Sequence, residues 1–184
     1  MSKKNAAHEL SVDCIYTALL QLMDTKPYSE ITITDITKKA GVSRMAYYRN
    51  FTDKDDILLS RLKAVLRSAE DRLRRAKNLS EERIWKEITD KTLKDRLIEK
   101  LIQAGLLGKV FVIMKDAMMN TYSGIYHWDF SDEDTVLQLY NRLGSLTGYL
   151  VYIYDYQQNL STDFLVKHLT LLGMDKEKQS GGNP

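Results

Sequence analysis

The stretch TITDITKKAGVSRMAYYRNF, residues 32–51, constrains the fold of this chain more than any other part of the sequence. Its first half carries apolar residues at helical spacing, and Thr34 is placed to cap a short helix there. Gly41 ends that helix because glycine tolerates the left-handed conformation, and Ser43 is placed to cap a second helix from Arg44 to Asn50. Two helices joined by so few residues must cross steeply. The pattern predicts a helix-turn-helix, whose second helix can lie in the major groove of DNA.

The predicted second helix divides into a buried face and an outward face. Val42, Tyr47 and Phe51 follow the helical repeat and are expected to pack against the first helix. The outward side chains are those of Arg44, Met45, Tyr48, Arg49 and Asn50. Arginine can hold guanine with two hydrogen bonds, methionine can contact a thymine methyl, and tyrosine or asparagine can reach phosphate oxygens. Spacing alone equally allows an ordinary helical hairpin with a solvated polar face.

The composition indicates a globular protein and gives little support to enzymatic or metal chemistry. The chain has 184 residues, of which 43% are hydrophobic, and its net charge is +2. The excess of Lys and Arg lies before residue 77, and the remainder is slightly acidic, which fits a DNA-facing N-terminal part. Cys14 is the one cysteine, the three histidines are scattered, and no nucleophile or phosphate-loop motif is present. No enzyme activity, metal or cofactor is therefore predicted.

The rest of the chain is also helical in pattern, so the predicted fold is all-α. A helix over 8–24 should pack on the helix-turn-helix, and a long helix over 54–76 should connect it to the remainder. The predicted organisation is a helix-turn-helix domain at 1–53, the connecting helix, a regulatory and dimerisation domain at 77–175, and a disordered tail at 176–184. The basic cluster at 72–77 lies far along the connecting helix and is interpreted as solvated. A signal peptide and a membrane-spanning run are not recognisable, so a cytoplasmic location is expected.

Two features of the predicted second domain point to ligand binding and to dimerisation. A long apolar helix over 109–126 carries flexible methionines and aromatic residues that could line a small-molecule pocket, although such residues are more often simply core. The candidate pocket residues are Phe111, Met114, Met118, Tyr122 and Tyr126. Helices over 132–158 and 162–172 have more apolar surface than one small domain can cover, so a homodimer joined by a four-helix bundle is predicted. The candidate interface residues are Leu139, Leu143, Leu146, Leu150, Leu165 and Leu169.

The segment ITITDITKKAGVSRMAYYRNFTDKDDIL resembles the N-terminal signature of the TetR family of transcriptional regulators, and the resemblance extends over residues 15–59. It implies that Thr34 and Ser43 contact the phosphate backbone and that Arg44 and Met45 face base edges. It also implies that phosphates are clamped by Tyr48, Asn50 and Lys54. Two positions depart from the family pattern: Asn50 stands where histidine is frequent, and Pro27 stands where glycine is frequent.

The resemblance, together with the predicted architecture, implies a homodimeric regulator that binds a palindromic double-stranded DNA operator. Repression relieved by a small-molecule ligand is the expected mode, because TetR-like proteins generally sense a ligand in the second domain. The alternatives are activation of transcription and a response to a protein partner instead of a small molecule.

Overall fold

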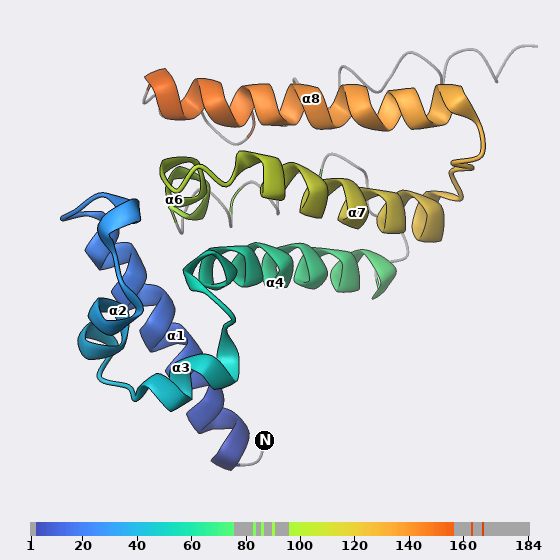
Figure 1. The fold of residues 1–184 in the computed structure, drawn as a ribbon. Helices are drawn as coiled ribbons and strands as arrows, with labels where there is room; N and C mark the ends of the chain where they lie inside the picture. The colour runs from blue at the N-terminus through green and yellow to red at the C-terminus, as the bar shows by residue number, and fades with distance from the viewer. Residues whose placement is uncertain are drawn as a thin grey trace, which may run out of the picture.

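The computed structural model describes residues 3–75 and 96–156, together with Arg83, Lys86, Asp90, Asp163 and Lys167. The elements, labelled as in Figure 1, are α1 (Lys3–Met23), the 3₁₀ helix η1 (Tyr28–Glu30), α2 (Ile33–Ala40), α3 (Arg44–Asn50), α4 (Lys54–Arg75), α6 (Leu97–Gln103), α7 (Leu107–Tyr126) and α8 (Glu133–Tyr156). The predicted all-helical fold with an N-terminal helix-turn-helix is confirmed.

Most predicted helix boundaries agree closely with the structure, and the first helix is the exception. α1 begins at Lys3 and not at residue 8. The connecting helix spans Lys54–Arg75. α6 and α7 are separated by a turn in which Gly105 has a φ of 71°. α7 and α8 agree with the predicted helices to within a few residues. Three parts of the chain lie outside the described residues: most of residues 76–95, most of the predicted helix over 162–172, and the tail.

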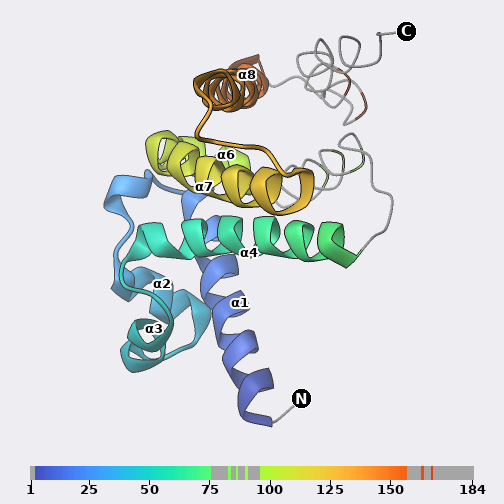
Figure 2. The ribbon, with the colours of Figure 1, turned by 90° about the vertical axis from the view of Figure 1, so that its right-hand side faces the viewer.

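The helices form a head, made of α1, η1, α2 and α3, and a body, made of α6, α7 and α8, with α4 between them. Figures 1 and 2 agree that α7 lies between α4 and α8, and that α3 lies at the end of the molecule remote from α8. α4 contacts both α1 and α7. A displacement of the body can therefore reach the head through α4. No helix in the described ranges is long and apolar enough to cross a membrane.

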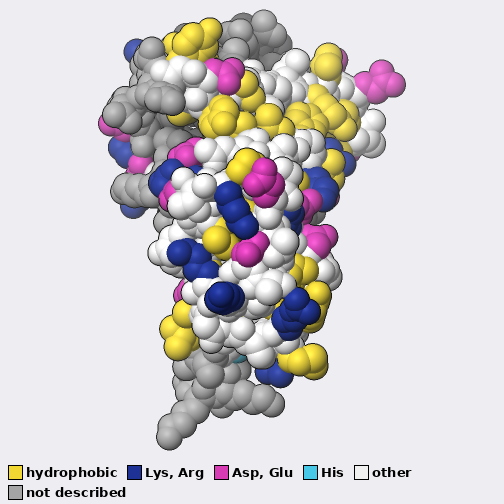
Figure 3. All heavy atoms as spheres, turned by 60° about the vertical axis from the view of Figure 1, so that its left-hand side comes forward, with side chains coloured by type: hydrophobic (Ala, Val, Ile, Leu, Met, Phe, Trp, Pro, Cys, Tyr) yellow, Lys and Arg dark blue, Asp and Glu magenta, His cyan; other side chains and the backbone are white. Residues whose placement is uncertain are grey.

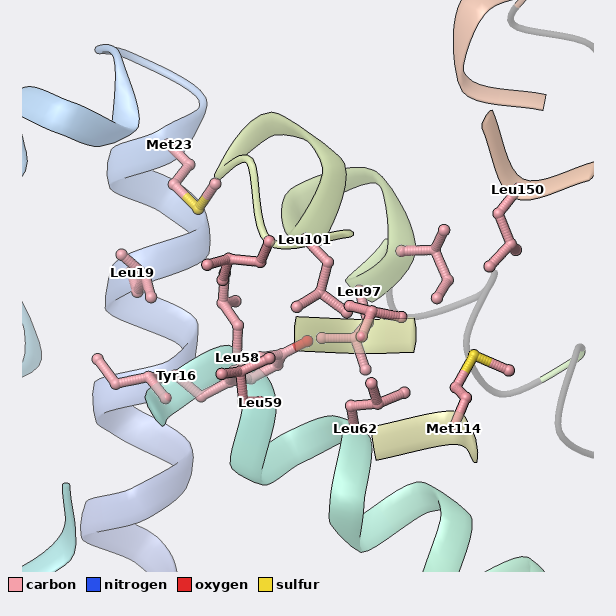
Figure 4. Packing of buried hydrophobic residues seen from close by; sticks show 14 of the residues in the cluster. Tyr16, Leu19, Met23, Leu58, Leu59, Leu62, Leu97, Leu101, Met114 and Leu150 are labelled. Atoms are coloured by element: carbon pink, nitrogen blue, oxygen red, sulfur yellow. The ribbon is translucent and has the colours of Figure 1, made fainter. Parts of the chain in front are cut away.

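A single cluster of buried hydrophobic residues runs from the head into the body. Figure 4 shows Leu19 and Met23 of α1 facing Leu58 of α4 and Leu101 of α6. Ile36, Tyr47 and Phe51 extend the cluster into the helix-turn-helix, while Met114 and Leu150 extend it into α7 and α8. Because the cluster is shared, the head is packed against the body and is not tethered by a flexible linker.

Candidate DNA-binding surface

The first helix of the helix-turn-helix is capped by Thr32, and the expectation that Thr34 caps it is wrong. The Thr32 hydroxyl accepts a hydrogen bond from the Asp35 backbone N–H, and the Asp35 carboxylate accepts one from the Thr32 backbone N–H. This reciprocal capping box requires an acceptor three residues after the cap, which Asp35 provides for Thr32. The Lys26 ammonium lies 2.7 Å from the same carboxylate. Hydrogen bonds from Lys26, and then from Thr32, hold the pKa of Asp35 well below its usual value.

The turn and the start of the second helix are as predicted. Gly41 has the left-handed conformation, with a φ of 67°, and follows the last residue of α2. The Ser43 hydroxyl accepts a hydrogen bond from the Ala46 backbone N–H at 3.1 Å, so Ser43 caps α3. Local signals therefore determine where α2 ends and where α3 begins.

α3 buries one face and exposes the other, as the helical repeat predicted. Tyr47 is fully buried and its ring lies 5.9 Å from that of Phe51, whereas Val42 is half-buried. On the opposite face the exposed fractions of Met45 and Tyr48 are 72% and 57%. Met45 and Tyr48 therefore lie open to solvent on the face of α3 that the sequence predicted to point outward.

The structure brings Thr34 and Arg44 together. The Arg44 guanidinium donates a hydrogen bond from Nη2 to the Thr34 hydroxyl, and both side chains are exposed. Asn50, by contrast, is turned back along its own helix, where its Nδ2 donates to the Ala46 carbonyl at 2.7 Å. Its Oδ1 atom is buried and has no hydrogen-bond partner in the described part of the chain. The predicted phosphate contact of Asn50 would require this side chain to rotate.

Lys54, the first residue of α4, has its side chain bound to backbone carbonyls of the head. Its Nζ atom donates to the carbonyls of Tyr28 at 2.7 Å and Ile31 at 3.1 Å, and it lies 4.4 Å from the centre of the Tyr28 ring. It therefore caps the C-terminal end of η1, a role that spacing along the sequence did not reveal. The phosphate contact that the family resemblance implies for Lys54 stays a prediction.

Among the described residues, polar side chains join the head to the body through Asp55 and through Asp24, contacts that the sequence did not predict. Asp55 accepts a hydrogen bond from the Tyr28 hydroxyl at 2.6 Å and pairs with Lys109 of α7 at 2.7 Å. Burial and the Asp55 carboxylate raise the pKa of Tyr28 well above its usual value. Asp24, just after α1, pairs with Lys100 of α6 at 2.6 Å. The signal for these contacts is weak, since charged residues at such wide separations are usually independent.

The candidate ligand residues lie on the inner side of α7. Met114, Met118 and Tyr122 are buried, whereas Phe111 and Tyr126 are half-buried. Tyr122 belongs to a polar and aromatic cluster: its ring lies 4.5 Å from Trp128, and its hydroxyl accepts a hydrogen bond from Arg142 at 2.8 Å.

A groove of about 590 Å³ opens elsewhere in the described part of the chain, where the head meets the α6–α7 turn. Its lining is Met23, Asp24, Lys26, Pro27, Tyr28, Ser29, Gln103, Ala104, Gly105 and Tyr154. It includes none of the five predicted pocket residues, so whether α7 binds a ligand stays a prediction. Among the described residues, no three His, Cys, Asp or Glu side chains lie close enough together to share a metal ion.

The residues of α8 that were predicted to form the dimer interface lie on the side of the helix that faces the core of the chain. Leu139, Leu143, Leu146 and Leu150 are all buried within the one chain, and their contact with a second copy stays a prediction. Leu165 and Leu169 lie outside the described residues. The exposed apolar residues of α8 are Leu137, Tyr140, Tyr152 and Tyr156. Figure 3 shows hydrophobic side chains gathered over the upper part of one face of the molecule, whereas Lys and Arg side chains are spread over its lower part.

These features define the class of protein. An N-terminal head with capped helices around a tight turn, an exposed recognition face on α3, and an all-helical body are typical of a helix-turn-helix regulator. Residues 15–60 match the family described as bacterial regulatory proteins, tetR family. The chain is 36% identical over 50 residues to the HTH-type transcriptional regulator EthR of Mycolicibacterium smegmatis, a match that covers 27% of this chain and 23% of that protein. Residues 15–60 are therefore a helix-turn-helix domain of the tetR family type, and the match to EthR spans less than a quarter of that protein's length.

Two solved structures share the fold over most of the chain. Lin0861 from Listeria innocua has a TM-score of 0.72 and 15% sequence identity, and the match covers 90% of each chain. The fatty acid degradation regulator FadR from Bacillus halodurans has a TM-score of 0.57 and 19% identity, with 90% of this chain and 96% of that chain covered. At these identities the likeness concerns the fold alone.

Proposed function

We propose that the protein is a homodimeric repressor that binds a palindromic DNA operator and is released from it by a small apolar ligand. The observation that carries this proposal is the exposed face of α3. Arg44, Met45 and Tyr48 project from a short helix at the end of the head, and the helix is held on its other side by the buried Tyr47. A rigid helix with one fully exposed face is what insertion into a major groove requires.

The exposed side chains suit different parts of a DNA duplex. Arg44 is suited to the O6 and N7 atoms of guanine, and Met45 to a thymine methyl group. The Tyr48 hydroxyl can reach a phosphate, as can backbone N–H groups at the capped start of α3 beside Ser43. Base contacts supply sequence preference, and phosphate contacts supply affinity that depends on salt.

The outward face of α8 is proposed as the dimer interface. Gly144 and Gly148 are exposed at its centre, and no atom lies within 4 Å of the place where a Cβ of either residue would be. Tyr140 and Tyr152 flank them with exposed fractions of 46% and 43%. Small residues between aromatic ones allow a second helix to approach closely at the centre while rings pack at each end.

A ligand is proposed to act through the contacts between head and body. Methionines on the inner side of α7 can repack around an apolar molecule because their side chains are flexible. Such repacking would move α7 or α6, and these helices hold the head through the Lys109–Asp55 and Lys100–Asp24 pairs. The ligand would then lower DNA affinity by favouring an orientation of the head that fits the operator less well.

The first experiment is selection of bound sequences from random duplex DNA with the purified protein, followed by a salt titration of the selected site. A palindromic site bound far more tightly than random DNA is expected, and Arg44→Ala should lower its affinity by about 5- to 150-fold. Lys63→Ala, an exposed change on α4, serves as the control. Failure to enrich any sequence, or unchanged affinity and preference in Arg44→Ala, would contradict the proposal and favour a protein partner for this surface.

The dimer is tested separately by sedimentation. Gly148→Arg, on the exposed side of α8, should convert the dimer to monomers because the long side chain blocks close approach of the second helix. Leu10→Arg, at a side chain that is 66% exposed on α1, should leave the dimer intact. A persisting dimer in Gly148→Arg would exclude this face.

A further inference from the structure

Thr34 has a partner in the structure that the family resemblance did not indicate. It lies near the start of α2, and its hydroxyl accepts a hydrogen bond from Arg44, the first residue of α3. Thr32 already caps α2, so the Thr34 hydroxyl is not required there. The two side chains join the exposed starts of both helices of the helix-turn-helix.

Arg44 keeps its charge uncompensated while it is held in this way. No carboxylate pairs with it in the part of the chain that the structure describes, since the acidic residue of the same turn of α2, Asp35, is occupied by Lys26 and by the capping box. A guanidinium carries five N–H donors, and a bond to one hydroxyl leaves the others available. The side chain can therefore be oriented by Thr34 and still present two parallel donors to a guanine.

We propose that Thr34 is a positioning residue that sets the base preference of Arg44. A free arginine side chain samples many rotamers, and fixing it before DNA arrives reduces the entropy lost when it binds a base. Thr34 then influences which base is read without itself contacting one. This inference rests on the proposed function, because it requires that Arg44 reads a base. A direct contact between the Thr34 hydroxyl and a phosphate is the competing role.

A double-mutant cycle separates the two roles. The variants are Thr34→Val, which keeps the shape and removes the hydroxyl, Thr34→Ser, which keeps the hydroxyl, Arg44→Ala, and the double variant Thr34→Val with Arg44→Ala. Each is titrated against the selected operator and against operators changed at single base pairs, at several salt concentrations. Thermal unfolding monitors the fold, and little change is expected because both side chains are exposed.

If Thr34 positions Arg44, Thr34→Val lowers operator affinity by about 3- to 10-fold, the range expected for one hydrogen bond. It relaxes preference at the same base pair that Arg44→Ala relaxes, and the double variant is no weaker than Arg44→Ala alone. Thr34→Ser restores both affinity and preference.

Additive losses in the double variant, or a uniform loss over all sequences, would overturn the inference and assign Thr34 to a phosphate. These outcomes differ from failure of the proposed function, in which the wild-type protein selects no operator or Arg44→Ala leaves base preference unchanged.

Discussion

Lys100 is a buried charged residue, and the structure predicts very different consequences for removing it and for removing its partner. Its side chain is 1% exposed, whereas that of Asp24 is 41% exposed. The Lys100 ammonium donates to Asp24 at 2.6 Å and to Gln103 Oε1 at 3.0 Å, and it lies 3.4 Å from Glu99. A buried ammonium is stable only while its donors are satisfied and its charge is balanced.

Asp24→Ala removes the closest counter-charge and leaves the ammonium buried. Breaking one side of a buried pair costs about 3–5 kcal/mol of the free energy of unfolding. Because Gln103 and Glu99 remain, we expect about 3 kcal/mol, the lower end of that range. Lys100→Met keeps the volume and removes the charge, and Asp24 stays paired with Arg96 at 3.1 Å. The free energy of unfolding is expected to change by no more than about 1 kcal/mol, because replacing a buried charge by an apolar side chain is often neutral.

The assay is urea unfolding followed by circular dichroism at one protein concentration, since a dimer makes stability depend on concentration. A pH series adds a second readout. The hydrogen bond from Lys100 is the largest influence on the Asp24 carboxyl, and its pKa lies below the ordinary value of 3.8. The stability that this carboxylate contributes is therefore present above its unfolded pKa and is lost as pH falls through the folded value. Lys100→Met should weaken that acid dependence. A loss in Lys100→Met equal to or larger than that in Asp24→Ala would refute the reasoning.

Three further predictions concern the head. Tyr47→Phe should leave the free energy of unfolding unchanged or raise it by up to about 1 kcal/mol in urea unfolding, because the buried Tyr47 hydroxyl has no hydrogen-bond partner in the described ranges; a clear loss would reveal a hidden partner. Gly41→Ala should cost about 1 kcal/mol from backbone strain alone, since φ is 67° and the space for a Cβ is open; an equal melting temperature would contradict this. Lys54→Met should lower stability by about 1–3 kcal/mol because the Tyr28 and Ile31 carbonyls lose a charged donor. The salt dependence of DNA binding should be the same in Lys54→Met as in the wild-type protein, and a flatter dependence in the variant would instead support a phosphate contact.

The local parts of the helix-turn-helix could be predicted because they depend on neighbouring residues. Gly41 and Ser43 act within one turn of the chain, and the burial of Tyr47 follows from the helical repeat. The error at α2 was also local. Thr32 and Thr34 are both able to cap a helix, and the choice is decided by Asp35, which can return a hydrogen bond only to Thr32.

Contacts between distant residues could not be predicted in this way. Lysine is a residue type that often binds phosphate, and the sequence therefore suggested this role for Lys54. Only the packing of η1 against α4 places two backbone carbonyls around its ammonium. Leu143 and Tyr140 both lie on apolar sides of α8, and periodicity does not say which side faces the chain's own core.

The sequence by itself determined the helical fold, the helix-turn-helix and the outward face of α3, because capping, glycine conformation and side-chain periodicity operate over a few residues. The tertiary structure decided that Arg44 is held by Thr34, that Lys100 is buried against Asp24, and that the inner leucines of α8 belong to one chain. These contacts join residues that are far apart in the sequence, and they depend on the relative placement of whole helices, which the shared hydrophobic core determines.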